Sequence, residues 1–155
     1  MSILPEIFYN YFIGTNNIPE LKKNEYNKFY YLSLINEGEN KWSIHGLWPQ
    51  YKKNQYPTFC NKVDFDIKKL DLILPELEKY WYSYKKNEKD DENFWKHEWE
   101  KHGSCMFTVM NEFDYFNKTL ELYNTAIQID IPHEFYDEKT NKCLIPITLD
   151  FKFDL

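Results

Sequence analysis

Three of the four histidines lie in two short segments that are rich in polar and aromatic side chains. His45 lies in WSIHGLWPQY, and His97 and His102 lie in FWKHEWEKHGSC. Imidazole is the side chain whose ordinary pKa is nearest to neutrality, so two histidines can act on a substrate as complementary base and acid. His133 stands alone after Pro132 and is expected at the surface.

The second segment predicts a helix that gathers four polar side chains on one face. At about 100° per residue, these positions fall within an arc of about 140°. The four residues are His97, Glu98, Lys101 and His102. A charged helix face is most often simply solvated. Here, however, Trp95 and Trp99 are four residues apart and indicate a helix that is anchored in a core.

The same segment raises two alternatives, a zinc site and a nucleophilic cysteine. HEWEKH resembles the zinc signature HExxH, but its histidines are five residues apart, which separates them by about 140° around a helix. That angle is too divergent for two ligands of one tetrahedral ion. Cys105 lies in an apolar stretch, where a cysteine usually packs or forms a bridge. We therefore expect neither a metal nor another cofactor.

Acid–base chemistry without a metal suits the cleavage of RNA. One imidazole removes the proton of the 2′-hydroxyl, which attacks the neighbouring phosphodiester, while the other protonates the departing 5′ oxygen. A lysine and a third histidine neutralise the charge that develops on the phosphoryl group, and a carboxylate positions or polarises its neighbours. DNA lacks the 2′-hydroxyl and is expected to be inert.

The composition limits the kind of partner. The chain of 155 residues fits one domain, 1–155, and has 19 lysines, no arginine and 25 acidic residues, for a formal charge of −6. This balance excludes broad electrostatic binding of a polyanion, so RNA has to be held at a local site. No apolar run approaches the roughly 18 to 20 residues of a membrane span. We expect a monomer that binds single-stranded RNA, with no DNA or membrane partner.

Local patterns predict an α+β fold, because strands and helices do not alternate strictly. Phe29 to Ile35 and Trp42 to Trp48 are predicted as strands joined by a turn, with Pro49 ending the second. Residues 145–153 alternate apolar and polar side chains and predict a half-buried strand. Residues 85–92 are expected as a charged loop. Three segments are predicted to be helical: 66–83 (with Pro75 in a first turn), 93–110 and 114–129.

Two motifs, IHGLWP at 44–49 and FWKHEWEKHGSC at 94–105, resemble the paired active-site segments of the ribonuclease T2 family. The resemblance extends more loosely from about Phe29 to the final strand. It implies an antiparallel sheet flanked by helices. It also implies an endoribonuclease that needs no metal, cleaves single-stranded RNA through a 2′,3′-cyclic phosphate and has little base specificity.

The resemblance also implies a role for individual residues. His102 resembles the base and His45 the acid of the first step, with the roles reversed when water opens the cyclic phosphate. His97 resembles the histidine that binds phosphate, and Glu98 and Lys101 resemble the residues that stabilise the transition state. A base-binding site is implied for three further residues: Trp48, which offers a stacking face, Gln50 and Tyr56.

Cysteine spacing alone leaves open whether all three thiols are free or one disulfide forms. The resemblance matches Cys60 and Cys105 to positions that are bridged in the family, and Cys143 is then left over. Family members are usually secreted or lumenal, although the N-terminal residues of this chain do not resemble a signal peptide.

Two departures from the family pattern concern the shape of the groove and base preference. The common Gln-Trp-Pro is absent after Leu34, and Tyr82 stands where a proline often follows the tryptophan. Two other functions are compatible with this sequence. One is a binding or signalling protein on the same fold. The other is a metal-dependent nuclease, which would lose activity in a chelator.

Overall fold

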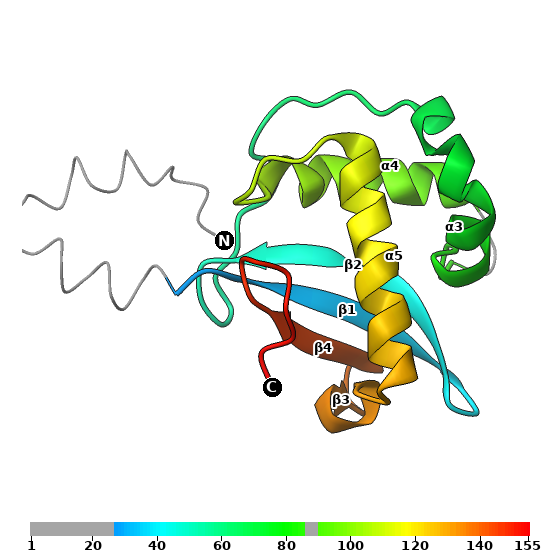
Figure 1. Ribbon diagram of the computed structural model, residues 1–155, viewed down its shortest axis with the longest axis vertical. Coiled ribbons are helices and arrows are strands. Elements are labelled where there is room, and N and C mark those ends of the chain that lie inside the picture. The colour runs from blue at the N-terminus through cyan, green and yellow to red at the C-terminus, as the bar shows by residue number, and fades with distance from the viewer. Residues whose placement is uncertain (1–26, 86–89) are drawn as a thin grey trace, which may run out of the picture.

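The structure, a computed structural model, describes residues 27–85 and 90–155. It has one antiparallel sheet with helices packed beside it, which confirms the predicted α+β class (Figure 1). The sheet runs in the order β2-β1-β4-β3. Its strands are β1 (Phe29–Gly38), β2 (Lys41–Gln50), β3 (Tyr136–Asp137) and β4 (Lys142–Ile147). The helices are η1 (Ile67–Ile73), α3 (Leu74–Tyr80), α4 (Asp91–Lys101), η2 (Gly103–Cys105), α5 (Glu112–Gln128) and η3 (Pro132–Phe135).

The hydrophobic core lies between the sheet and α5, which runs across the sheet in Figure 1. Leu32 and Leu34 on β1 are fully buried there, as the period-two pattern requires. Two tyrosines of α5 tie the helix to β2: the Tyr115 hydroxyl donates to the Leu47 carbonyl at 2.9 Å, and the Tyr123 hydroxyl to the Trp42 carbonyl at 2.7 Å. α5 therefore occupies one face of the sheet and leaves the other free for a site.

β2 is longer than predicted, because Pro49 does not end it. Pro49 pairs with Tyr30 inside the ladder, and the strand continues to Gln50. Proline has no N–H to donate, but β2 lies at an edge of the sheet. An edge strand can contain proline where its nitrogen faces away from the neighbouring strand. The edge position of β2 thus explains the difference.

α4 ends at Lys101, so the prediction of one helix over 93–110 was wrong. The helix begins where the Asp90 side chain accepts from the Asn93 N–H at 3.1 Å. At its other end, a Cβ built on Gly103 would overlap the Trp99 ring. Glycine therefore lets the chain turn tightly over that ring into η2, and residues 106–110 have no regular structure.

The C-terminal strand is shorter and earlier than predicted. β4 covers 142–147, whereas the expected strand was 145–153. The chain turns after Ile147, with the Thr148 N–H donating to the Lys152 carbonyl at 2.8 Å, and Phe153 then returns to pair with Ile147. After the turn, Phe151 and Phe153 pack against the same core as β4, whereas Leu149 is exposed.

The remaining predicted segments agree more closely with the structure. η1 and α3 occupy 67–80, with Pro75 in the first turn of α3, and α5 occupies 112–128. Of the expected loop at 85–92, residues 86–89 lie outside the described part, and Asp91 and Glu92 already belong to α4. In the described residues, no helix combines the length and the apolar character needed to span a bilayer.

Candidate active site

A cavity of about 410 Å³ lies between the free face of the sheet and α4. We call it the main cavity. All eight polar or aromatic residues that the sequence singled out line it: His45, Trp48, Gln50, Tyr56, His97, Glu98, Lys101 and His102. The two motifs, about fifty residues apart in the chain, therefore meet at one cavity.

A β-bulge in β2 sets the position of His45. Ser33 pairs with Gly46 and Leu34 pairs with Ile44, so His45 has no partner in the ladder. A bulge turns the extra side chain out of the regular alternation, and bulges are common next to active sites. After the bulge, successive side chains of β2 again alternate between the two faces of the sheet, but the pattern is shifted by one residue. Because of this shift, Gly46 lies on the face that carries the main cavity.

The imidazole of His45 is held by packing. Its ring lies edge-on to Trp48, with centroids 4.9 Å apart, and it also contacts Tyr84 at 5.2 Å and Phe94 at 5.7 Å. The backbone carbonyl of His45 accepts from the Trp81 indole at 3.0 Å. Nδ1 is buried without a hydrogen-bond partner in the described part of the chain. The orientation of the ring therefore depends on its aromatic neighbours.

His102 occupies the end of α4. Its N–H donates to the Glu98 carbonyl at 2.9 Å, which completes the last turn of the helix. The side chain is only 4% exposed and stacks on Trp48, with ring centroids 5.2 Å apart and planes 26° apart. Trp48 thus contacts both histidines, His45 in a T-shaped arrangement and His102 in a stacked one.

Glu98 is a buried carboxyl that is fixed to β2. It is 2% exposed, and its Oε1 accepts from the Trp48 indole N–H at 2.9 Å. Burial raises the pKa of Glu98 to about 7, although the Trp48 hydrogen bond and Lys101 oppose the shift. The carboxyl therefore titrates near neutrality, in a position that bridges α4 and β2.

Both central histidines are neutral at pH 7. Burial lowers the pKa of His45 to about 3, with further lowering by Lys142 and Lys101. Burial likewise holds the pKa of His102 well below 6.5, with a smaller effect of Lys101. A neutral imidazole carries a free nitrogen lone pair and can accept a proton.

Lys142 is a functional candidate that the sequence analysis missed. β4 pairs with β1 so that Ile35 faces Lys142 and Ser33 faces Leu144, and these side chains lie on the face opposite Leu34. The Lys142 ammonium lies 5.5 Å from the centroid of a Trp48 ring. Burial lowers its pKa, with Glu98 opposing the shift. In KCLIPI, the alternation of side chains indicates that Lys142 lies on the face away from the core. No local pattern, however, indicates which strand β4 pairs with.

His97 lies at the rim of the main cavity on the exposed side of α4. Its ring centroid is 6.0 Å from that of Phe59, and the planes are 69° apart. Burial and Lys101 lower its pKa. His97 therefore meets solvent, whereas His102, five residues later, is enclosed.

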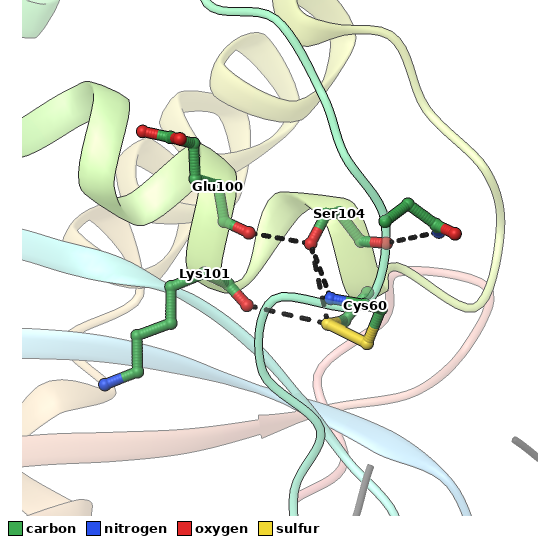
Figure 2. Close-up of a disulfide and its surroundings, with 6 residues drawn as sticks. Cys60, Glu100, Lys101 and Ser104 are labelled. Atoms are coloured by element: carbon green, nitrogen blue, oxygen red, sulfur yellow. Dashed lines mark hydrogen bonds between the residues drawn. A yellow bond between two sulfur atoms is a disulfide. The ribbon is translucent and has the colours of Figure 1, made fainter. Parts of the chain in front are cut away.

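The disulfide lies at the end of the second histidine motif, which contains Cys105. Cys60 and Cys105 are bridged, as the family resemblance implies, and the bond spans 45 residues of chain. In Figure 2, Ser104 supports the bridge: its hydroxyl accepts from the Cys60 N–H at 3.1 Å and donates to the Glu100 carbonyl at 2.7 Å.

Cys143 is free and fully buried, and burial raises the pKa of its thiol to about 12. It belongs to the core.

Replacing Gly46 by alanine is expected to lower the RNA cleavage that the family resemblance implies by about 10-fold or more while the protein still folds. A Cβ at this position would overlap Oε1 of Glu98 and crowd the Trp48 indole nitrogen. The carboxyl then has to leave its hydrogen bond, and a positioned group that moves by about 1 Å can cost roughly 10²-fold. Steady-state kinetics test this, with Val109→Ala as the control, because that side chain is 94% exposed. Equal activities in the two variants would contradict the role given to Gly46.

Comparison with curated proteins gives the following relatives. A profile described as the ribonuclease T2 family matches residues 12–133. Ribonuclease 1 of Arabidopsis thaliana is 39% identical over 82 residues, which cover 52% of this chain and 36% of that protein. Ribonuclease T2 of Homo sapiens is 38% identical over 86 residues, which cover 53% of this chain and 32% of that protein. The matched part of this chain thus covers about a third of the length of each of these two relatives.

Solved structures share the fold at lower identity. The RNase-related protein from Calystegia sepium has a TM-score of 0.64 at 20% identity, and the match covers 82% of this chain and 89% of that chain. Human RNase T2 has a TM-score of 0.62 at 21% identity, with coverage of 82% and 89%. Because the family profile spans most of the chain, including both histidine motifs and the first bridged cysteine, the chain belongs to the ribonuclease T2 family.

Proposed function

We propose that the chain is an endoribonuclease that cleaves single-stranded RNA by acid–base transphosphorylation through a 2′,3′-cyclic phosphate, without a metal. The observation that carries this proposal is the main cavity, where two neutral imidazoles from different elements share one tryptophan. Family membership supports the same activity. A phosphodiester in this cavity would have a histidine available on each side.

His102 is the base of the first step. Its neutral imidazole accepts the proton of the 2′-hydroxyl, whose oxygen then attacks phosphorus while the bond to the 5′ oxygen breaks. Because the His102 ring is buried against Trp48, it stays neutral and its orientation is fixed. In the second step the same group returns this proton as water opens the cyclic phosphate.

His45 is the acid that protonates the leaving 5′ oxygen. In the empty cavity Lys142 and Lys101 help to hold its pKa low, so it carries no proton at pH 7. A bound phosphodiester brings a negative charge beside all three groups. That charge favours the imidazolium form, so substrate binding raises the pKa of His45 and prepares it as the acid.

The positive charge of the site comes from lysine. Lys101 on α4 and Lys142 on β4 both line the main cavity, and the chain has no arginine. Two ammonium groups from different elements suit the negative charge that develops on the phosphoryl oxygens. His97 at the rim binds a phosphate. Glu98, held by Trp48, stabilises the transition state together with Lys101.

The base next to the scissile phosphate binds on the side of Trp48, Gln50 and Tyr56. Tyr56 is exposed enough to stack, and stacking accepts every base because each has a π-face. Gln50 is buried and offers an amide at the wall of the cavity. Because aromatic contacts dominate this side, we propose little base specificity.

The proposal is tested with an RNA oligonucleotide and its deoxy counterpart, each incubated with and without EDTA and followed by mass spectrometry of the products. We expect the RNA to be cleaved equally in both conditions, with 2′,3′-cyclic phosphate ends, and the DNA to stay intact. Cleavage of the DNA, or loss of RNA cleavage in EDTA, would sink the mechanism. Intact RNA in every condition would favour a binding protein on this fold.

A further inference from the structure

Phe59 exposes an aromatic ring next to the proposed active site. The residue is 57% exposed, although large apolar side chains are normally buried. Its ring contacts that of His97, which lines the main cavity. Phe59 does not itself line the main cavity, so it lies just outside the place where bond cleavage is proposed.

The backbone of Phe59 is held in an unusual conformation. Its φ of 49° lies in the left-handed region, which a bulky residue seldom adopts. Two contacts fix the segment: the Phe59 N–H donates to the Lys101 carbonyl at 2.9 Å, and the disulfide ties the next residue, Cys60, to Cys105. The ring is therefore attached firmly to the end of α4. A platform that is already ordered loses little freedom when a ligand binds.

A second cavity, of about 330 Å³, lies beside Phe59, and we call it the Phe59 cavity. It is lined by Phe59, Cys60, Asn61, Lys62, Val63 and Glu100. Lys62 supplies an ammonium, while the Asn61 amide already donates to the Ser104 carbonyl at 3.0 Å. Glu100 places one carboxylate opposite, so the cavity has no large excess of positive charge. An aromatic face and one cation suit a single nucleotide better than a free anion.

We propose that Phe59 is a stacking platform for a nucleotide of the bound RNA strand that lies outside the scissile dinucleotide, with Lys62 facing its phosphate. The inference rests on the proposed function, because it places the strand in the main cavity and extends it past His97. The chain is acidic, so affinity for a longer strand has to come from such local contacts. Phe59 is then a binding residue and takes no part in the chemical step.

The test uses substrates with one ribonucleotide in a DNA strand, because only that position can be cleaved by the proposed mechanism. The first substrate is the dinucleotide alone. The second carries two extra deoxynucleotides on its 5′ side, and the third carries two on its 3′ side. Each substrate is made in four versions, one for each base of the ribonucleotide. For the wild type we expect a lower KM for one of the two extended substrates. Phe59→Ala should raise that KM by about 5- to 150-fold, the usual range for losing one stacked base. Phe59→Ala should leave unchanged the KM of the dinucleotide, and also the kcat of the dinucleotide and of that extended substrate.

Three further variants complete the experiment. Phe59→Trp should keep the low KM, because it retains a stacking ring. Phe59→Asn removes the ring but suits a left-handed backbone, so it should fold as well as the wild type and repeat the alanine result. Val109→Ala changes a side chain that is 94% exposed and should have no effect. Equal KM values for the dinucleotide and both extended substrates in the wild type, or an unchanged ratio in both Phe59→Ala and Phe59→Asn, would overturn the inference. A wild type that cleaves none of these substrates would instead refute the proposed function and, with it, this inference.

Discussion

Replacing either His102 or His45 by phenylalanine is expected to lower kcat for RNA by about 10²- to 10⁴-fold, the usual contribution of a positioned acid or base. Phenylalanine keeps a flat ring, so the stacking of Trp48 on position 102 and its T-shaped contact with position 45 can persist. The loss should therefore appear in kcat while the circular dichroism spectrum stays unchanged. Lys96→Ala, an exposed change on the same helix, serves as the control. Near-normal turnover in either phenylalanine variant would remove that histidine from its role.

The same substitutions should make the protein more stable in acid. The folded pKa of His45 is about 3, below its ordinary value of 6.5, so between these pH values the unfolded chain binds a proton that the folded chain does not. Wild-type stability therefore falls as the pH drops below 6.5. At pH 4.5 this difference amounts to about 3 kcal/mol, since each pKa unit corresponds to about 1.4 kcal/mol.

Urea unfolding at pH 7 and pH 4.5 measures this effect. When the pH is lowered from 7 to 4.5, the free energy of unfolding of the wild type should fall by about 3 kcal/mol more than that of His45→Phe. The shifted titration of Glu98 is present in both proteins, so it largely cancels in the comparison. Parallel pH dependence in the two proteins would show that His45 is not held neutral by the fold.

Removing the disulfide by Cys60→Ala with Cys105→Ala should lower the free energy of unfolding by about 4 kcal/mol. The bridge closes a segment of 45 residues, and cross-linking a loop of that length restricts the unfolded chain by roughly this amount. For a domain of this size the melting temperature should fall by about 8–16 °C. The polar loop that carries Tyr56 and Phe59 leads directly into Cys60, so loss of the bridge should also loosen that wall of the site.

Melting curves with and without dithiothreitol measure the disulfide effect. Reductant should lower the melting temperature of the wild type and leave the double variant unchanged. Cys143→Ala is the matched control, because Cys143 is a buried free thiol, and this variant should still respond to reductant. A wild type that melts at the same temperature in both conditions would show that the bridge adds no stability.

Several features of the site are local and can be inferred from the sequence. Glu98 and His102 lie on one side of the helical segment because they are four residues apart, close to the helical repeat. The strands β1 and β2 follow from two apolar runs and the turn between them, and both motifs that carry the family resemblance are contiguous in the chain. The pairing of Cys60 with Cys105 is different, because it depended on the resemblance: three cysteines allow several pairings.

Other features depended on contacts between distant segments. Lys142 enters the main cavity because β4 pairs with β1, about a hundred residues earlier, and no local periodicity specifies that partner. His45 reaches the cavity through a bulge, which is defined only by the register between two strands. The low pKa of His45 and the raised pKa of Glu98 arise from burial under other elements. Local patterns thus identify the groups that we propose for the chemistry. Their charge state, their orientation and the presence of the second lysine follow from the assembled fold, because burial and strand pairing exist only there.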